Sequence, residues 1–346
     1  MIMKKYIQIP HLIVILFCYT GCETEIDFPI NHLPPTIVVN GLLETDSVFK
    51  VHLSTSAKVT GNIEHKVLET AAVKIKDEDG QLFDLELVEY NDNSSSKFYK
   101  STGDYKPIPG KQYFIEASNT GIPSISATLT MPEVVELSNV KFASDQFQVF
   151  ERNQENNPEY PNAFFLPVRL TINDQPGENY YELSVLEEHL PLSYINQQGE
   201  LVNSPGFFLP VTVFSYNTFL NSSDIENWEG LDGVDYYRRG ELLFSDEPFD
   251  GKALDVEILA FTTVRLNGFP EPLIEHVSNR RFHVVLNHVS KEYYTYRQTL
   301  RNYLENRHNN FVEPINVYSN IKNGLGIFLG NTSHKVALDP NNQEHY

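Results

Sequence analysis

Cysteine is almost absent from this chain, and basic residues are scarce. Only Cys18 and Cys22 occur among its 346 residues, so the sequence after them offers no disulfide. A chain of this length can bury enough apolar surface to fold without such cross-links. Its 26 lysines and arginines stand against 46 aspartates and glutamates, which gives a formal net charge of −20. That balance argues against nucleic acid and anionic membrane surfaces as partners.

Recognisable catalytic and cofactor-binding patterns are also absent. The chain has no G-x-S-x-G nucleophile elbow, no H-E-x-x-H zinc motif, no cysteine cluster and no glycine-rich phosphate loop. Glu187 and Glu188 are adjacent in a predicted strand, which directs them to opposite faces. That geometry is poor for acid–base work on one substrate. We therefore predict no catalytic residue, no metal site and no cofactor, in a protein that is not an enzyme.

Two acidic segments keep calcium open as an alternative. Asp77 and Asp79 could offer oxygen ligands, but Asp77–Gly80 is also typical of a hairpin turn, and the later bidentate glutamate of a calcium loop is missing. The second segment, FSDEPFDGK, is denser in carboxylates. It contains Asp246, Glu247 and Asp250. We interpret it by default as a solvated turn.

The N-terminus has the layout of a secretory signal. The basic pair Lys4 and Lys5 precedes an apolar run, Leu12–Phe17, that is too short to span a bilayer as a helix. Small residues follow directly before Cys22, and this arrangement resembles a bacterial lipoprotein signal. The resemblance implies removal of residues 1–21 and lipid attachment at Cys22, where two acyl chains anchor a protein stably. The alternative is an ordinary secreted protein.

Acidic residues follow the cysteine at once, at Glu23, Glu25 and Asp27. In lipoproteins of Bacteroidota, acidic residues at this place resemble a signal for export to the cell surface. The resemblance implies that residues 22–35 form an acidic tether on a lipid-anchored protein of the outer membrane, displayed at the cell surface. The alternative is a solvated linker without an export role.

Short alternating segments dominate residues 36–132. In Phe49–Ser54 apolar side chains alternate with polar ones, and Asp77–Gly80 separates two further segments by a turn. About seven short strands with regular turns predict an immunoglobulin-like β-sandwich. Aromatic residues make up 12% of the chain, which also favours strands.

Residues 133–346 predict a second β-rich domain with one amphipathic helix near residues 290–307, so the fold class is mainly β. Ser290 is a suitable N-cap for the helix, and the charge of Glu292 suits its first turn. Tyrosines recur at helical spacing, and we interpret their stripe as core packing; a sugar or aromatic ligand is the alternative. The charged side chains expected on the other faces of the helix are Lys291, Arg297, Arg301 and Glu305.

Several segments along the chain together carry a family resemblance. They are Cys22 with its acidic tail, PTIVVNGLL at Pro35–Leu43, AAVKIKDEDG at Ala71–Gly80, the tyrosine- and glycine-rich segment before Met131-Pro132, FSDEPFDGK at Phe244–Lys252 and VYSNIKNGLGIF at Val317–Phe328. In this order they resemble domain of unknown function family 4249, a set of lipoproteins from Bacteroidota, over nearly the whole chain after Cys22. Members are often encoded beside TonB-dependent outer-membrane receptors, which implies a role next to a nutrient transporter. The family has no established catalytic residues.

Two further features are candidate sites. Asp46-Ser47-Val48 resembles the short acceptor motif for O-glycosylation in Bacteroidota, with Ser47 as the modified residue; a plain turn is the alternative. Residues 145–162 and 217–239 predict long loops, where binding residues concentrate. The second loop contains residue types that are common at binding hot spots, although they could also fold back onto the core. These candidate partner-binding residues are Trp228, Tyr236, Tyr237, Arg238 and Arg239.

The functional expectation follows from the lipid anchor, the acidic tail and the frequent location of the family's genes beside those of TonB-dependent receptors. We expect a non-enzymatic binding or accessory component of a TonB-dependent transport system, with an outer-membrane TonB-dependent receptor as its partner. Two alternatives remain open. One is a surface hydrolase acting on glycan or peptide, and the other is a structural or adhesion module.

Overall fold

The computed structural model describes residues 34–56, 66–89, 97–143, 148–151, 162–189, 192–195, 201–204, 206–215, 241–264, 281–307, 309, 313 and 315–338. The chain divides into two compact units, Met1–Pro34 and Pro35–Tyr346, and every described helix and strand belongs to the second. Within the described residues, strands dominate and there is one helix, so the predicted mainly β class is confirmed. No described helix is both long and apolar enough to cross a bilayer.

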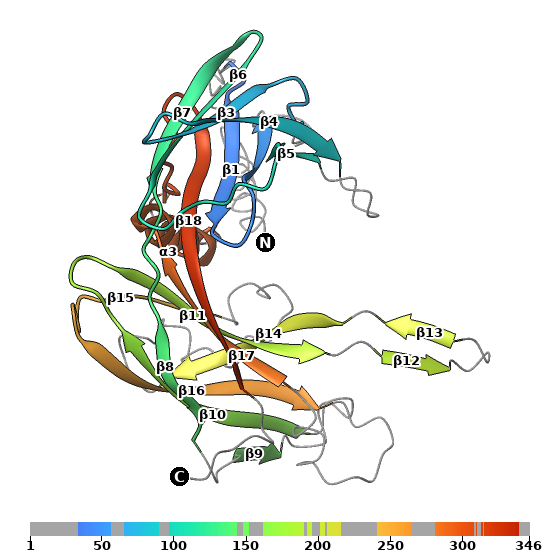
Figure 1. The fold of residues 1–346 in the computed structure, drawn as a ribbon, viewed down its shortest axis with the longest axis vertical. Coiled ribbons are helices and arrows are strands. Elements are labelled where there is room, and N and C mark those ends of the chain that lie inside the picture. Colours follow the sequence, from blue (N-terminus) through green and yellow to red (C-terminus); the bar gives the residue numbers. More distant parts are fainter. Residues whose placement is uncertain are drawn as a thin grey trace, which may run out of the picture. The chain divides into compact units, whose positions relative to one another are not determined.

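The first seven strands enclose one apolar core together with the start of the last strand (Figure 1). They are β1 (Ile37–Glu44), β2 (Lys50–Thr55), β3 (Ala72–Asp77), β4 (Leu82–Glu89), β5 (Lys97–Ser101), β6 (Gln112–Asn119) and β7 (Ile122–Thr130), with β18 (Leu325–Leu338) as the last. Their hydrogen-bonded order is β7-β6-β3-β4-β5-β2-β1-β18. A bridge between Ser126 of β7 and Lys322, just before β18, brings the two ends of this order together. The arrangement fits the predicted immunoglobulin-like sandwich.

Alternation of apolar and polar residues explains how these strands build the core. In β3 the side chains of Val73, Ile75 and Asp77 are buried, whereas those of Lys74 and Lys76 are exposed. Successive side chains in a strand point to opposite faces, so this pattern is the one that a half-buried strand requires. It also carries an acidic side chain, Asp77, to the buried face at the end of the strand.

The remaining strands continue the same sheet from β18 in the order β18-β17-β11-β14-β16-β10-β8, with β15 beside β11 and β9 beside β10. They surround a second apolar core. A separate pair, β12 and β13, forms a short hairpin. The bounds are β8 (Leu137–Phe142), β9 (Gln148–Glu151), β10 (Asn162–Asn173), β11 (Tyr180–His189), β12 (Leu192–Ile195), β13 (Leu201–Ser204), β14 (Phe207–Ser215), β15 (Glu241–Ser245), β16 (Ala253–Val264) and β17 (Arg281–Val289).

Strand β18 belongs to both groups of strands. From Leu325 to Asn331 it pairs in parallel with β1, and from Asn331 to Leu338 it pairs antiparallel with β17. Gly326 permits the parallel pairing, because its φ is +95° and a Cβ there would lie 1.9 Å from the carbonyl oxygen of Val39. The predicted domain boundary after residue 132 lies between β7 and β8, and the last strand of the chain joins the two sides of it.

The helix α3 (Lys291–Asn306) lies where the sequence predicts it. Ser290 caps it, accepting a hydrogen bond at Oγ from the backbone N–H of Tyr293 at 3.3 Å, and Glu292 occupies the first turn. Tyr293 is buried in a small cluster with residues of β11, β15, β17 and β18. Tyr294 stacks on Tyr180 of β11 with ring centroids 4.4 Å apart. The tyrosines at the start of the helix therefore pack against the sheet, as the core interpretation expects.

Candidate functional site

Of the residues singled out in the sequence as candidate sites, Ser47 is described. It lies in the turn between β1 and β2, half-buried, where its N–H donates to the carbonyl oxygen of Glu44 at 3.1 Å. Glycosylation at Ser47 remains a prediction. The other candidate residues lie outside the described part of the chain and also remain predictions: Cys22, Glu23, Glu25, Asp27, Trp228, Tyr236, Tyr237, Arg238 and Arg239.

The carboxylates of Asp77 and Asp79 in the turn pair with a lysine of the same chain. The ammonium of Lys111 lies 2.8 Å from Asp77 Oδ2 and 2.7 Å from Asp79 Oδ2. Asp77 also accepts a hydrogen bond from the N–H of Gln81 at 2.8 Å. Burial opposes ionisation of Asp77, but the bonds from Lys111 and Gln81 outweigh it and hold the pKa of that carboxyl below its usual value. The turn joins the paired strands β3 and β4, as the hairpin interpretation expects, and its two aspartates form ion pairs with Lys111.

The second acidic segment meets a third aspartate from a distant turn. Oxygens of Asp246 and Asp250, between β15 and β16, and of Asp174, after β10, all lie within 4.8 Å of one another. Glu247 is not part of this group. Burial, together with the charges of the two neighbouring aspartates, raises the pKa of Asp174 despite a hydrogen bond from Tyr181. Three carboxylates at this spacing could hold a divalent cation.

Donors from the protein already satisfy much of this acidic cluster of Asp174, Asp246 and Asp250. The N–H of Gly251 donates to Asp174 Oδ2 at 2.7 Å. The N–H of Gly177 donates to Asp250 at 2.8 Å, and the side chain of Asn179 donates to Asp246 at 3.0 Å. These bonds run between the β10–β11 turn and the β15–β16 loop. The cluster therefore pins two turns together.

A buried carboxylate lies beneath helix α3. Glu182 of β11 accepts hydrogen bonds from Asn287 at 3.1 Å, from the hydroxyl of Tyr293 at 2.7 Å and from Arg297 at 3.1 Å. The same guanidinium contacts Glu241 of β15. Burial and the nearby Glu241 raise the pKa of Glu182 to about 7, although Arg297 opposes the shift.

The Glu182 network corrects one expectation about the helix. Arg297 was expected on a face away from the sheet, yet its side chain points to Glu182, and its carbon Cζ lies 5.6 Å from the ring centroid of Tyr293. Alternation along β11 places Glu182 on the face opposite the core residues Tyr181 and Leu183. The acidic residue within the apolar strand was the available signal for a buried network. The Glu182 network connects helix α3 to the strands β11, β15 and β17.

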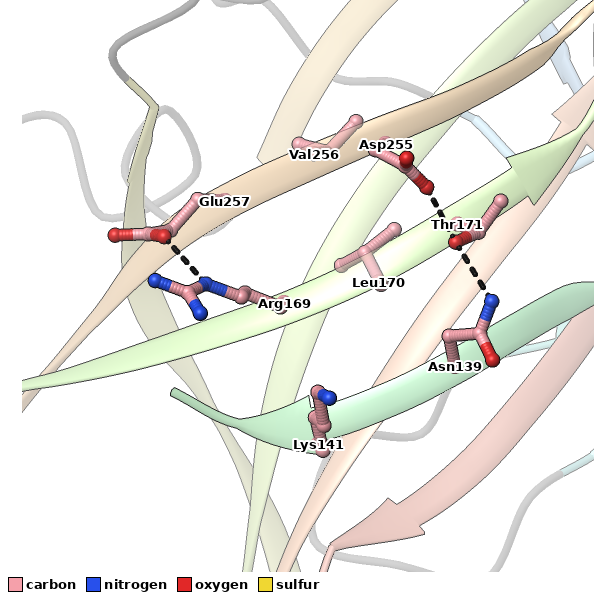
Figure 2. Close-up of a pocket in the computed structure, with 8 residues that line it drawn as sticks. All are labelled: Asn139, Lys141, Arg169, Leu170, Thr171, Asp255, Val256 and Glu257. Atoms are coloured by element: carbon pink, nitrogen blue, oxygen red, sulfur yellow. Dashed lines mark hydrogen bonds and ion pairs between the residues drawn. The ribbon is translucent and has the colours of Figure 1, made fainter. Parts of the chain in front are cut away.

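A polar hollow of about 390 Å³ lies over β8, β10 and β16 (Figure 2). The polar side chains that line it alternate along the strands with core residues, so the hollow occupies the face of these strands that points away from the apolar core. Sequence reasoning missed it, because its residues come from three separate segments. They are Asn139, Lys141, Arg169, Leu170, Thr171, Asp255, Val256 and Glu257.

Exposed apolar side chains gather on a two-stranded ribbon. His189 of β11 pairs with Phe207 of β14, and Leu192 of β12 pairs with Ser204 of β13. The last pair of the first ladder and the first pair of the second are three positions apart along both chain segments. The pairing of β12 with β13 therefore has the same register as that of β11 with β14. We call the described residues 185–189, 192–195, 201–204 and 206–211 the ribbon. The exposed fractions are 67% for Leu201, 47% for Phe207, 48% for Phe208 and 46% for Leu209.

A sequence profile described as domain of unknown function (DUF4249) matches residues 23–336. The chain belongs to this family. No curated protein matches the chain. The segments that suggested family 4249 form parts of the fold described above: Pro35–Leu43 contains most of β1, Ala71–Gly80 contains β3 and its turn, and Phe244–Lys252 contains two members of the acidic cluster. Val317–Phe328 leads into the pairing of β18 with β1.

Proposed function

We propose that this protein is a lipid-anchored outer-membrane protein, displayed at the cell surface, that binds a TonB-dependent transporter as a non-enzymatic accessory component. The observation that carries the binding part is the exposed apolar surface of the ribbon. Monomeric proteins rarely expose large contiguous apolar patches, and such patches mark surfaces that a partner covers. The transporter as the partner is supported by membership of a family whose genes often lie beside such receptors.

The chemistry around Phe208 fits a protein partner. The ammonium of Lys335, from β18, lies 3.9 Å from the centroid of the Phe208 ring, and His283 of β17 contacts the same ring at its edge. Aromatic side chains are enriched in protein–protein interfaces. The opposite face of β14 presents Leu209. A partner that receives the ribbon would therefore contact apolar side chains on both of its faces.

Purification from outer membranes in mild detergent tests this proposal. We expect a TonB-dependent receptor to be recovered with the tagged protein in a stoichiometric amount. The double variant Phe208→Ser, Leu209→Ser should reduce that recovery at least about tenfold, because hot-spot side chains typically contribute 2 kcal/mol or more each. The matched control is Leu82→Ser, which changes a side chain of β4 that is 59% exposed and lies outside the ribbon.

Two outcomes would contradict the proposal. One is the absence of any stoichiometric receptor with the wild-type protein. The other is equal recovery with the ribbon variant and with Leu82→Ser. The anchor is tested separately by Cys22→Ser, which should release the protein from membranes into the soluble fraction. Continued sedimentation of this variant with membranes in high salt would show that another part of the chain attaches it.

A further inference from the structure

The polar hollow over β8, β10 and β16 is a trough between two rows of side chains (Figure 2). The first row runs across the strands from Asn139 to Thr171 and Asp255, and its members are joined: Asn139 Nδ2 donates to Thr171 Oγ1 at 3.2 Å, and Thr171 Oγ1 donates to Asp255 Oδ1 at 2.6 Å. Between the rows lie Leu170 and Val256, whose side chains are buried in the core.

The second row contains only charged residues: Lys141 of β8, Arg169 of β10 and Glu257 of β16. Arg169 donates from Nε to Glu257 Oε2 at 2.8 Å. That bond leaves the two terminal nitrogens of the guanidinium without a partner among the described residues. Lys141 likewise forms no ion pair or hydrogen bond within the described part of the chain. The second row therefore has donors to spare on β8 and β10.

An irregularity in β8 builds the first row. The pairing of β8 with β10 shifts between Arg169 and Thr171, so that two residues of β8 lie opposite one residue of β10. Asn139 lies in this bulge with φ of +53°, a left-handed conformation that few residues other than glycine adopt. Bulges of this kind redirect a side chain. Here the bulge turns Asn139 to the trough while its neighbour Val140 packs on the core.

Charge is distributed unequally along the trough. Lys141 stands at its β8 end, and the carboxylates of Asp255 and Glu257 stand at its β16 end. Adjacent strands lie about 4.8 Å apart, so the two ends are separated by about 10 Å. Within a strand, the two rows are two residues apart, which is about 7 Å. The trough therefore offers a positive end, a negative end and neutral hydrogen-bonding groups between them.

We propose that this trough binds a short peptide with free termini, with its ammonium group at Asp255 and Glu257 and its carboxylate at Lys141 and Arg169. An extended chain spans at most about 3.6 Å per residue, so three residues match the separation of the two ends. A single amino acid is too short to reach both. The peptide amides meet Asn139, which can accept at Oδ1 and donate from its second N–H, and the hydroxyl of Thr171, which already donates to Asp255 and so can only accept. A neutral sugar chain has no charge to match either end.

This inference goes beyond the proposed function and does not depend on it. The trough residues lie on β8, β10 and β16, whereas the ribbon residues lie on β11 to β14. Peptide binding can therefore be present when receptor recovery fails, and absent when it succeeds. The outcome of the receptor-recovery experiment on the ribbon therefore does not decide whether the trough binds a peptide, and the reverse also holds.

Calorimetric titration of the purified full-length lipoprotein in detergent tests the inference, with triglycine as the probe. For so small a ligand we expect saturable binding with a dissociation constant on the order of 1 mM. N-acetyl-triglycine and triglycinamide, which each lack one terminal charge, should bind about fivefold more weakly, as removal of an exposed charge pair implies. Glycine should bind no better than these derivatives.

Two variants assign the ends of the peptide. Asp255→Asn should weaken triglycine about fivefold and have little further effect on N-acetyl-triglycine, whereas Lys141→Gln should do the same with triglycinamide. The matched control is Asp84→Asn, which removes an exposed carboxylate that pairs with Lys74 on β3 and β4. Absence of saturable triglycine binding would overturn the inference. So would blocked derivatives that bind as strongly as triglycine, or equal effects of Asp255→Asn and Asp84→Asn.

Discussion

Two buried carboxylates in different parts of the fold have pKa values that are shifted in opposite directions. Asp77, beside the core of β1–β7, has a lowered pKa, whereas Glu182, beneath α3, has a pKa raised to about 7. Each is paired with a cation, Lys111 for the first and Arg297 for the second. The presence of a buried ion pair therefore does not by itself decide which protonation state is favoured.

The difference lies in what else surrounds each pair. Asp77 shares the charge of Lys111 with Asp79, which is exposed to solvent, and it also accepts a hydrogen bond from a backbone N–H. Glu182 shares Arg297 with Glu241, and that second carboxylate repels it. Desolvation raises the pKa of both, and the balance of charge close by determines whether it is outweighed.

Loss of the cation beneath the helix should have the largest effect. Arg297→Met leaves Glu182 buried without a counter-charge and should lower the free energy of unfolding by about 3 kcal/mol at pH 8. At pH 5 the loss should be clearly smaller, because Glu182 is then protonated. Denaturant titrations at the two pH values measure this. An equal loss at both would show that Arg297 acts by packing alone.

The corresponding change at the hairpin should have a smaller effect. Lys111→Met should cost about 2 kcal/mol at pH 7, since Asp77 keeps its hydrogen bond from Gln81. The cost should shrink as the pH falls through the folded-state pKa of Asp77, which lies below its ordinary value of 3.8. If Lys111→Met lowered the free energy of unfolding at neutral pH by more than Arg297→Met does, the order that we expect for the two ion pairs would be wrong.

In the wild-type protein the two regions should respond to pH in opposite directions. Glu182 has a folded-state pKa above its ordinary value of 4.5, so its contribution to stability is present below that value and is lost as the pH rises through about 7. Asp77 has a folded-state pKa below 3.8, so its contribution is present above 3.8 and is lost as the pH falls. Hydrogen exchange corrected for intrinsic rates should show protection of α3 and β11 decreasing from pH 5 to 8, without a similar decrease in β3 and β4.

The smallest effect is expected at the helix cap. Ser290→Ala removes the side-chain acceptor of the Tyr293 N–H and should cost about 1 kcal/mol at any pH. Ser290→Asn should retain most of the stability, because asparagine also caps helices well. A pH-dependent cost, measured by thermal unfolding, would indicate that the cap and the Glu182 network are coupled.

Local patterns in the sequence were sufficient for much of the fold. Ser290 and Glu292 predicted the start of α3, and the turn at Asp77–Gly80 was correctly placed between two strands. Each of these features depends on residues a few positions apart. Arg297 was placed wrongly, because a charged side chain on an amphipathic helix faces water unless a buried partner receives it. That partner, Glu182, lies 115 residues away.

Features that depend on distant segments could not be read from the sequence. The parallel pairing of β1 with β18 joins the two ends of the described chain, and only the glycine at 326 hints at a close approach. Asp174 joins Asp246 and Asp250 although more than 70 residues separate them. The bulge at Asn139 has no local signature either, because an asparagine in a left-handed conformation looks like any other asparagine in the sequence.

Photocross-linking in intact cells tests the central proposal most directly. A photoreactive phenylalanine analogue replaces Phe208 in the ribbon, and the same analogue at Leu82 serves as the control. We expect a light-dependent adduct between the protein carrying the analogue at 208 and a TonB-dependent receptor of the outer membrane, with none from position 82. Adducts only with lipid, or receptor adducts of equal yield from both positions, would contradict it.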